Sequence, residues 1–163
     1  MDTLITYWPW FVGAIVLAAL AALLRLVVPH RRLPYQKRSR LVTKAELRFY
    51  RALLRSAQDD FLVFSMVRVA DLLLVPESTP QRRLWLNRIV GKHIDFVLCD
   101  PGTLEPKLAI ELDDATHQRE DRAARDQFLN QAFEAAGLPL LRVAVQESYE
   151  AKSLREAIEK RLS

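Results

Sequence analysis

The sequence predicts an α/β domain, built as a three-layer α/β/α sandwich around a mixed four-stranded sheet and preceded by one transmembrane helix. Three observations support this class. Residues 5–24 form an uncharged apolar run near the N-terminus. Helical and strand periodicities alternate along the rest of the chain. Two predicted strands, residues 93–99 and 107–113, are separated only by a turn, so that this strand pair is antiparallel.

The N-terminal apolar run is long enough to cross a bilayer. No charged residue occurs between Asp2 and Arg25, and residues 5–24 match the roughly 20 residues that a helix needs to span the hydrocarbon core. A cleaved signal peptide is the alternative, because residues 18–22 are rich in alanine. The run is long and no Lys or Arg precedes it, so we predict a membrane anchor over residues 1–28.

A basic segment follows the anchor, and residues 29–40 are predicted to be a juxtamembrane linker. Six cations and no acid occur from Arg25 to Arg40. The positive-inside bias then places the N-terminus outside and the domain in the cytoplasm of a single-pass protein, for which we expect a bacterial inner membrane. Without these six cations and Asp2, the 24 basic and 20 acidic residues of the chain become 18 and 19, a net charge of −1 from Leu41 onward. The basic excess therefore favours contact with anionic lipid over a nucleic-acid-binding arm.

The domain, residues 41–163, is predicted to begin with a helix. The segment from Thr43 to Glu46 matches a capping box, and apolar residues then recur on one helical face. Residues 61–69 are rich in β-branched and aromatic side chains, which predicts a buried strand. A short amphipathic helix is predicted over residues 82–89. Its three arginines are expected on a solvated face, with phosphate contact as the alternative.

The second half of the domain predicts a helix, a strand and a helix. Residues 118–136 form the first helix, which ends where Gly137 favours a left-handed cap and Pro139 prevents continuation. Residues 138–145 are almost continuously apolar, which predicts a central strand. A right-handed crossover is expected to make this strand parallel to the preceding one. Residues 151–162 complete the domain as an amphipathic helix.

The position of the turn predicts which residues of the two hairpin strands are paired. Residues 100–103 have the sequence Asp-Pro-Gly-Thr, which reverses a backbone. Cys99 is expected to face Lys107 at the turn end of the antiparallel pair. Period-two alternation places three apolar residues of the first strand on one face: Ile94, Phe96 and Leu98.

Three acidic residues interrupt the apolar pattern of this hairpin. The predicted register sets Asp95 directly opposite Glu111, with Cβ atoms about 4.5–5.5 Å apart. Asp113 lies one same-face step further along its strand. Carboxylates this close repel each other unless a cation or a proton neutralises them. The pattern therefore suggests a divalent metal bound by Asp95, Glu111 and Asp113.

The acids and the elements that follow them resemble a known superfamily. The residues that carry the resemblance are Asp95, residues 111–114, His117, Arg122, Asp126 and residues 136–143. They resemble the PD-(D/E)xK restriction-endonuclease-like superfamily, in particular its very-short-patch-repair-like branch, and more narrowly the domain-of-unknown-function family 2726. The resemblance covers about residues 41–145 and implies a restriction-endonuclease-like fold.

The resemblance also implies a metal-dependent nuclease that hydrolyses phosphodiester bonds. Asp95 takes the place of the first acid of the motif and Glu111 that of the second, and together they would hold Mg²⁺ or Mn²⁺. A hard cation polarises a phosphoryl oxygen and lowers the pKa of a bound water. The implied partner of the domain is nucleic acid, while the N-terminal helix is expected to contact the lipid bilayer.

The sequence departs from the motif at its third position, where Asp113 stands in place of Lys. Asp113 is therefore a candidate metal ligand or catalytic group, and the positive charge of the motif has no fixed source. The candidates for this vacant role are Lys92, Lys107, Arg122 and Gln118. His117 is a candidate general base or leaving-group donor, because its ordinary pKa of about 6.5 suits either role.

Several candidates also have structural interpretations. Glu46 fits a capping residue better than an extra metal ligand. His93 is expected to orient Asp95 rather than to bind metal. His117 can cap the helix that follows it. Arg122 lies four residues before Asp126, a spacing typical of an ordinary ion pair on a helix.

The predicted function is a membrane-anchored, cytoplasm-facing, metal-dependent nuclease. The alternative is a catalytically inactive module of the same fold that binds nucleic acid or protein at the membrane. The missing Lys and the net charge of −1 favour the inactive module, whereas the convergence of Asp95, Glu111 and Asp113 favours the enzyme.

Overall fold

The computed structural model describes residues 2–27, 33–113 and 120–163. The chain divides into two compact units, Met1–Arg38 and Ser39–Ser163. The second unit holds every strand among the described residues and all the predicted site residues that the structure describes. Each unit is therefore treated by itself.

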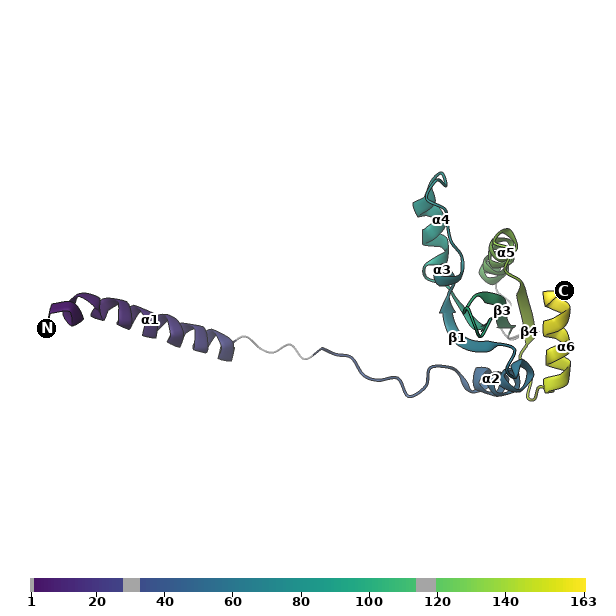
Figure 1. The fold of residues 1–163 in the computed structure, drawn as a ribbon, viewed down its shortest axis with the longest axis horizontal. Coiled ribbons are helices and arrows are strands. Elements are labelled where there is room, and N and C mark those ends of the chain that lie inside the picture. The colour runs from purple at the N-terminus through teal and green to yellow at the C-terminus, as the bar shows by residue number, and fades with distance from the viewer. Residues whose placement is uncertain (1, 28–32, 114–119) are drawn as a thin grey trace. The chain divides into compact units, whose positions relative to one another are not determined.

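The first unit contains helix α1, Asp2–Val27 (Figure 1). Its segment Tyr7–Leu24 is long and apolar enough to cross a membrane, and none of it is buried. Pro9 lies inside the helix, beyond its first turn, where it removes one backbone hydrogen bond of the helix. The predicted apolar helix is thus present, and its length and composition suit an anchor as well as a signal sequence.

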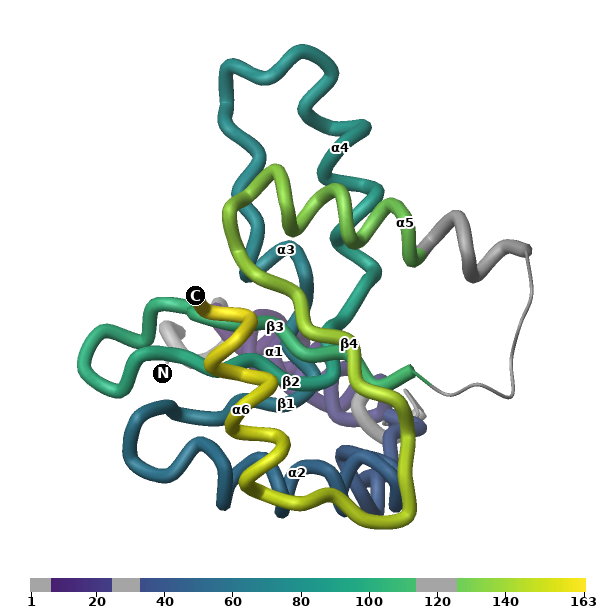
Figure 2. Tube along the Cα trace, turned by 90° about the vertical axis from the view of Figure 1, so that its right-hand side faces the viewer, coloured from purple at the N-terminus to yellow at the C-terminus, as the bar shows by residue number. Residues whose placement is uncertain are grey.

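The second unit is built on a mixed four-stranded sheet, as predicted (Figures 1 and 2). The strands lie side by side in the order β1-β2-β3-β4, with the bounds Leu62–Arg68, His93–Cys99, Pro106–Asp113 and Leu140–Ala144. β1 and β2 are antiparallel, as are β2 and β3, whereas β3 and β4 are parallel. A parallel pair needs a crossover, and helix α5, Glu120–Ala135, supplies it.

Helices cover both faces of the sheet and give the three layers. Helices α2, Lys44–Ala57, and α6, Ala151–Leu162, lie on one face, over what we call the α2–α6 core. This core consists of Phe49, Ala52, Leu53, Ala57, Phe96, Leu98, Leu108, Ile110, Leu154 and Ile158. The one-turn helix α3, Val69–Leu72, helix α4, Arg82–Ile89, and α5 lie on the other face.

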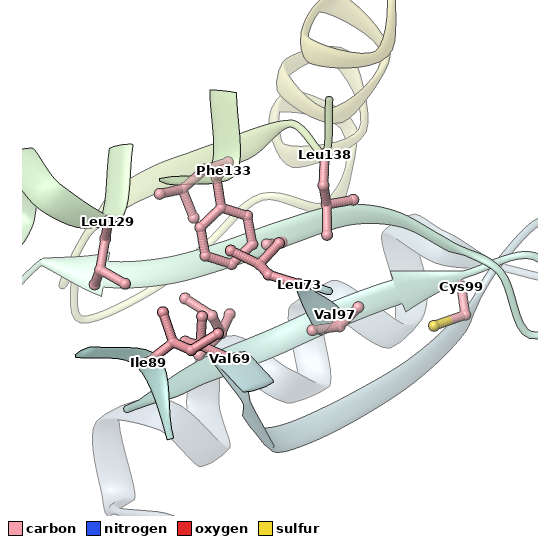
Figure 3. Close-up of a cluster of buried hydrophobic side chains, with 11 residues drawn as sticks. Val69, Leu73, Ile89, Val97, Cys99, Leu129, Phe133 and Leu138 are labelled. Carbon is pink, nitrogen blue, oxygen red and sulfur yellow. The ribbon is translucent and has the colours of Figure 1, made fainter. Parts of the chain in front are cut away.

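The second face holds what we call the α4–α5 core. It consists of Val69, Leu73, Ile89, Ile94, Val97, Cys99, Ala109, Leu129, Phe133, Leu138 and Leu140. Figure 3 shows Leu129 and Phe133 pointing from α5 toward Val69 and Ile89. Burial raises the pKa of the Cys99 thiol, as expected for a small apolar side chain in a core. The alternating residues of β2 and β3 thus divide between two separate cores.

The position of β4 corrects one prediction. The apolar run at residues 138–145 predicts a central strand, but β4 lies at the edge of the sheet. Leu140 belongs to the α4–α5 core, whereas Leu141 and Val143 pack against the α2–α6 core. The apolar run therefore reflects helices on both faces of the strand and not a neighbouring strand on each side.

The hairpin formed by β2 and β3 has the predicted register along most of its length. Phe96 pairs with Ile110, as the turn predicts. An irregularity at the turn end shifts the pairing by one residue, so that Cys99 faces Pro106 and not, as predicted, Lys107. This shift accommodates the turn and leaves the pairing at the opposite end of the hairpin unchanged.

Asp100 organises the turn of the hairpin. Its Oδ1 accepts hydrogen bonds from the backbone N–H of Gly102 at 3.0 Å, and from the N–H and the hydroxyl of Thr103, both at 2.9 Å. These donors favour the ionised carboxylate, so the pKa of Asp100 lies below its usual value, chiefly because of Thr103. Leu104 completes the turn in the left-handed region, with φ of 61°.

Helix α2 begins with the predicted capping box. The backbone N–H of Glu46 donates to Oγ1 of Thr43 at 3.2 Å, and the backbone N–H of Thr43 donates to Oε2 of Glu46 at 2.7 Å. Two N–H groups that the helix itself leaves without acceptors are thereby satisfied. The capping interpretation of Glu46 is therefore confirmed.

The Thr43→Ala substitution is expected to lower the free energy of unfolding by about 1 kcal/mol, because one N-terminal donor of α2 loses its acceptor. Glu46→Gln should cost less, since a glutamine oxygen can still accept the reciprocal hydrogen bond. Urea titration of the full chain in detergent micelles measures both changes. A Thr43→Ala variant as stable as the wild type would contradict the capping role.

Candidate functional site

The two opposed acids of the hairpin lie where β2 and β3 stop pairing. The last cross-strand pair at this end is Phe96 with Ile110. The same register, continued by one residue, places Asp95 opposite Glu111. In place of a further ladder bond, Oδ2 of Asp95 accepts a hydrogen bond of 2.8 Å from the backbone N–H of Leu112. The Asp95 carboxylate therefore lies between the two strands, with its orientation fixed by the β3 backbone.

The alternation of β2 is broken at Asp95. Met66 on β1 stands opposite Asp95 in the register and has φ of 56°, an uncommon conformation for a residue other than glycine. Ile94 belongs to the α4–α5 core, although Phe96, two residues later, belongs to the α2–α6 core. The prediction that these two side chains share one face is wrong. The alternation of β2 is therefore interrupted between Ile94 and Phe96, at Asp95.

Glu111 lies in the interior of the sheet, on β3. The residue is partly buried and its Oε2 is shielded from solvent. The parallel register of β3 and β4 places Arg142 beside Glu111. Paired residues of neighbouring strands point to the same face of a sheet. A carboxylate removed from water needs a positive or hydrogen-bonding environment, and β4 brings a cation to that face.

Arg142 connects β4 to β3 and α5. Its Nη1 donates to Oδ1 of Asp113 at 2.7 Å, and its Nε donates to Oδ1 of Asn130 at 3.2 Å. Its Nη2 lies 3.4 Å from Oδ1 of Asp126. The side chain of Arg142 is only 22% exposed, so these pairs are less screened than surface ion pairs. The guanidinium of Arg142 thus contacts one carboxylate on β3, and one carboxylate and one amide oxygen on α5.

The partner of Asp113 alters the predicted three-carboxylate site. The Asp113 carboxylate forms an ion pair with Arg142 at 2.7 Å. Among the described residues, no group of three or more His, Cys, Asp and Glu side chains is arranged to hold a metal ion. The register therefore juxtaposes Asp95 and Glu111, while Asp113 has a different partner.

Other predicted site residues have different surroundings. The ammonium group of Lys92 lies 5.8 Å from the ring centroid of Phe128 on α5. Lys107 forms an ion pair with Glu105 at 2.6 Å, and this hydrogen bond raises the pKa of Lys107. His93 is exposed at the start of β2.

Three further candidates lie outside what the structure describes. His117 and Gln118 belong to residues 114–119, and the side chain of Arg122 also falls outside the described residues. Their predicted catalytic roles therefore have no structural test. Of the predicted ion pair between Arg122 and Asp126, the structure describes the second member, which contacts Arg142.

The sequence interpretation missed the role of Arg142 and its contacts on α5. One signal was present, because Arg142 is the single charged residue of the apolar run at residues 138–145. A cation in a partly buried strand needs an acidic partner. The pattern does not say which acid it is, since Asp113 precedes Arg142 by 29 residues.

A family model matches the domain that carries this site. It is described as a protein of unknown function (DUF2726), and it matches residues 38–162. Neither the curated proteins nor the solved structures yield a match. The matched region contains β1 to β4, both cores and the Asp95, Glu111 and Arg142 positions. Because the match covers well over half of the 163 residues, the chain belongs to the DUF2726 family of proteins of unknown function.

Proposed function

We propose that the domain is a metal-dependent nuclease of the PD-(D/E)xK, restriction-endonuclease-like type, which hydrolyses phosphodiester bonds of nucleic acid. The observation that carries this proposal is the placement of Asp95 and Glu111 on neighbouring strands, at the point where the strands stop pairing. Side chains on paired strands are held more rigidly than side chains on loops. Such a pair can present carboxylate oxygens to one ligand.

The donor set fits a hard divalent cation. Asp95 and Glu111 would hold Mg²⁺ or Mn²⁺, since Mg²⁺ is usually bound through one or two carboxylates while it retains several waters. When bound, the ion polarises a phosphoryl oxygen and lowers the pKa of a bound water. The hydrogen bond from the backbone N–H of Leu112 to Asp95 Oδ2 holds that carboxylate in place beside β3. The shielded Oε2 of Glu111 keeps part of the second carboxylate away from bulk water.

Arg142 is assigned the positive charge that the motif places on Lys. It stands beside Glu111 on β4, whereas the ammonium group of Lys92 lies over Phe128. Arginine stays protonated at all ordinary pH values, so in this role it stabilises negative charge on phosphate oxygens and does not act as a base. Asp113 then positions the guanidinium and does not serve as a third metal ligand.

The membrane part of the proposal rests on α1 and on the basic segment that follows it. The segment Tyr7–Leu24 has the length and composition of a membrane span. Six cations without an acid occur from Arg25 to Arg40. By the positive-inside bias, the N-terminus would lie outside and the domain in the cytoplasm, for which we propose a bacterial inner membrane.

A catalytically inactive module is the second candidate. The observation that favours it is the ion pair of Asp113, the residue at the Lys position of the motif, with Arg142. In this interpretation the three-way contact of Arg142 with Asp113, Asp126 and Asn130 only stabilises the fold. The domain would then bind nucleic acid or protein at the membrane without cleavage.

Metal binding and cleavage by the full chain in detergent micelles test the proposal. We expect the wild type to bind Mn²⁺ and to cut DNA or RNA, single- or double-stranded. Asp95→Asn and Glu111→Gln should lose Mn²⁺ binding measured by calorimetry. Their cleavage rates should fall by about 10²–10³-fold, the usual effect of removing one group that stabilises charge in an active site.

Glu105→Gln is the matched control, because Glu105 is an exposed acid of the same hairpin whose partner is Lys107. It should keep both metal binding and cleavage. The enzyme proposal fails if the wild type binds no more Mn²⁺ than Glu111→Gln and cuts none of these nucleic acids. Retention of nucleic acid without cleavage would instead support the inactive module.

A further inference from the structure

The segment between α3 and β2 forms an arm, residues 73–91, that extends away from the sheet beyond α5 (Figures 1 and 2). Large apolar side chains on this arm face solvent. Leu74 is 85% exposed and Leu84 is 55% exposed, and Trp85 is exposed as well. Of the residues of α4, Ile89 is the one that is buried in the domain. The arm therefore has large apolar side chains that its packing against the domain leaves exposed.

The same arm is positively charged. Three arginines lie on α4: Arg82, Arg83 and Arg88. The arm contains one acid, Glu77, so its net charge is +2. The guanidinium carbon of Arg88 lies 3.9 Å from the ring centroid of Phe128 and 5.4 Å from that of Trp85. These cation–π contacts join Trp85 through Arg88 to α5, so the indole is held on a fixed support.

We propose that residues 73–91 dock on the surface of an anionic lipid bilayer. Exposed leucines and a tryptophan next to arginines are the side chains that bind at a membrane interface. The apolar groups enter the acyl boundary, the indole lies at headgroup level and the arginines meet anionic headgroups. This inference rests on the membrane-anchoring part of the proposed function and is independent of the nuclease chemistry.

Because the segment between α1 and α2 ties the domain to the membrane anchor, weak docking is sufficient to hold the arm on the bilayer surface. Residues 28–43, which are 16 residues, connect α1 to α2. Such a segment spans at most about 55 Å when extended. As a flexible chain its typical end-to-end distance is roughly 22 Å. A bilayer that holds α1 therefore keeps the domain within reach at a high effective concentration, so a few leucines and arginines can hold the arm on the surface.

A single-stranded nucleic acid is the competing occupant, because Trp85 and Arg88 also offer faces on which bases stack. The aliphatic side chains of the arm favour lipid over single-stranded nucleic acid. Leu74 and Leu84 offer neither a π-face nor a charge to a nucleotide. In a bilayer, each Å² of apolar surface removed from water contributes about 25 cal/mol. The composition of the arm thus favours lipid.

The test uses the full chain with Trp8→Phe and Trp10→Phe, which leaves Trp85 as the single tryptophan of the original three. This protein is reconstituted into vesicles of phosphatidylcholine with phosphatidylglycerol, and separately into pure phosphatidylcholine. In the anionic vesicles we expect Trp85 emission to shift to shorter wavelength and to be quenched by lipid that is spin-labelled near the headgroup. The shift should be lost in neutral vesicles and at high salt.

Leu84→Ser should abolish the shift, whereas Leu104→Ser should keep it. Leu104 is the matched control, because it has the same exposed fraction of 55% but lies in the β2–β3 turn. Arg83→Glu should also abolish the shift. Arg51→Glu, at an exposed position on α2, should not.

Two different failures are distinguishable. Unquenched Trp85 emission that is the same in both lipids overturns the docking, while resistance of the chain to extraction by alkaline carbonate shows that the anchor still holds. Extraction of the chain by carbonate overturns the anchor, and with it the tethered docking. A shift of Trp85 emission with single-stranded DNA or RNA, but not with anionic vesicles, assigns the arm to nucleic acid and also overturns the lipid proposal.

Discussion

The Phe96→Ala substitution is expected to lower the free energy of unfolding of the domain by about 3–5 kcal/mol, the usual cost of truncating a buried phenylalanine. Phe96 is fully buried in the α2–α6 core. Its ring centroid lies 5.4 Å from that of Phe49 and 6.0 Å from that of Tyr50, whose ring is stacked on it at 20°. The loss leaves a cavity between the sheet and α2, because close-packed surroundings relax only in part.

Urea titration followed by near-ultraviolet circular dichroism measures this loss, because Tyr50 and Tyr149 report on the packing of the same aromatic cluster. Phe96→Leu is the control. It keeps most of the side-chain volume, so it should cost distinctly less than Phe96→Ala. A loss below about 0.5 kcal/mol for Phe96→Ala, the size typical of a surface substitution, would contradict the central role of this ring.

The elements of the domain could be predicted because each leaves a local pattern. The capping box of Thr43 and Glu46 marks the start of α2 to the residue. The Asp-Pro-Gly-Thr turn sets the pairing of Phe96 with Ile110. The order of strands has no such local signal. The run at residues 138–145 records that both faces of β4 are covered, and its place at the sheet edge depends on contacts far away in the sequence.

The candidate site could be predicted only as far as the hairpin register reaches. Asp95 and Glu111 lie on neighbouring strands, so spacing from the turn is enough to oppose them. The positive φ of Met66, which stands opposite Asp95, occurs on a different strand and has no signature in the sequence of β2. The partner of Asp113 comes from β4, across the crossover helix α5. A long-range ion pair of this kind cannot be derived from the spacing of either residue.

The Arg142→Ala substitution is expected to make the stability of the domain depend more strongly on divalent metal than that of the wild type does. The guanidinium binds Asp113 and Asp126 and stands beside Glu111. Without it and without metal, these carboxylates repel one another at a cost of about 1–3 kcal/mol, less than for a fully buried pair because the group is partly solvated. Mg²⁺ at about 100 times its Kd would restore about 2.7 kcal/mol by mass action.

Cleavage and stability together separate the role of Arg142 from that of Glu111. Arg142→Ala should bind Mn²⁺ at least as tightly as the wild type but lose cleavage, whereas Glu111→Gln should lose both. Arg155→Ala is the matched control, because Arg155 also joins two acids, Asp60 and Glu159, and its loss should not enlarge the response to metal beyond that of the wild type. If Mg²⁺ raises the urea midpoint of Arg142→Ala no more than that of Arg155→Ala, the acids around Arg142 form no cation site. In that case the residues around Asp95 and Glu111 would provide no evidence for the proposed metal site.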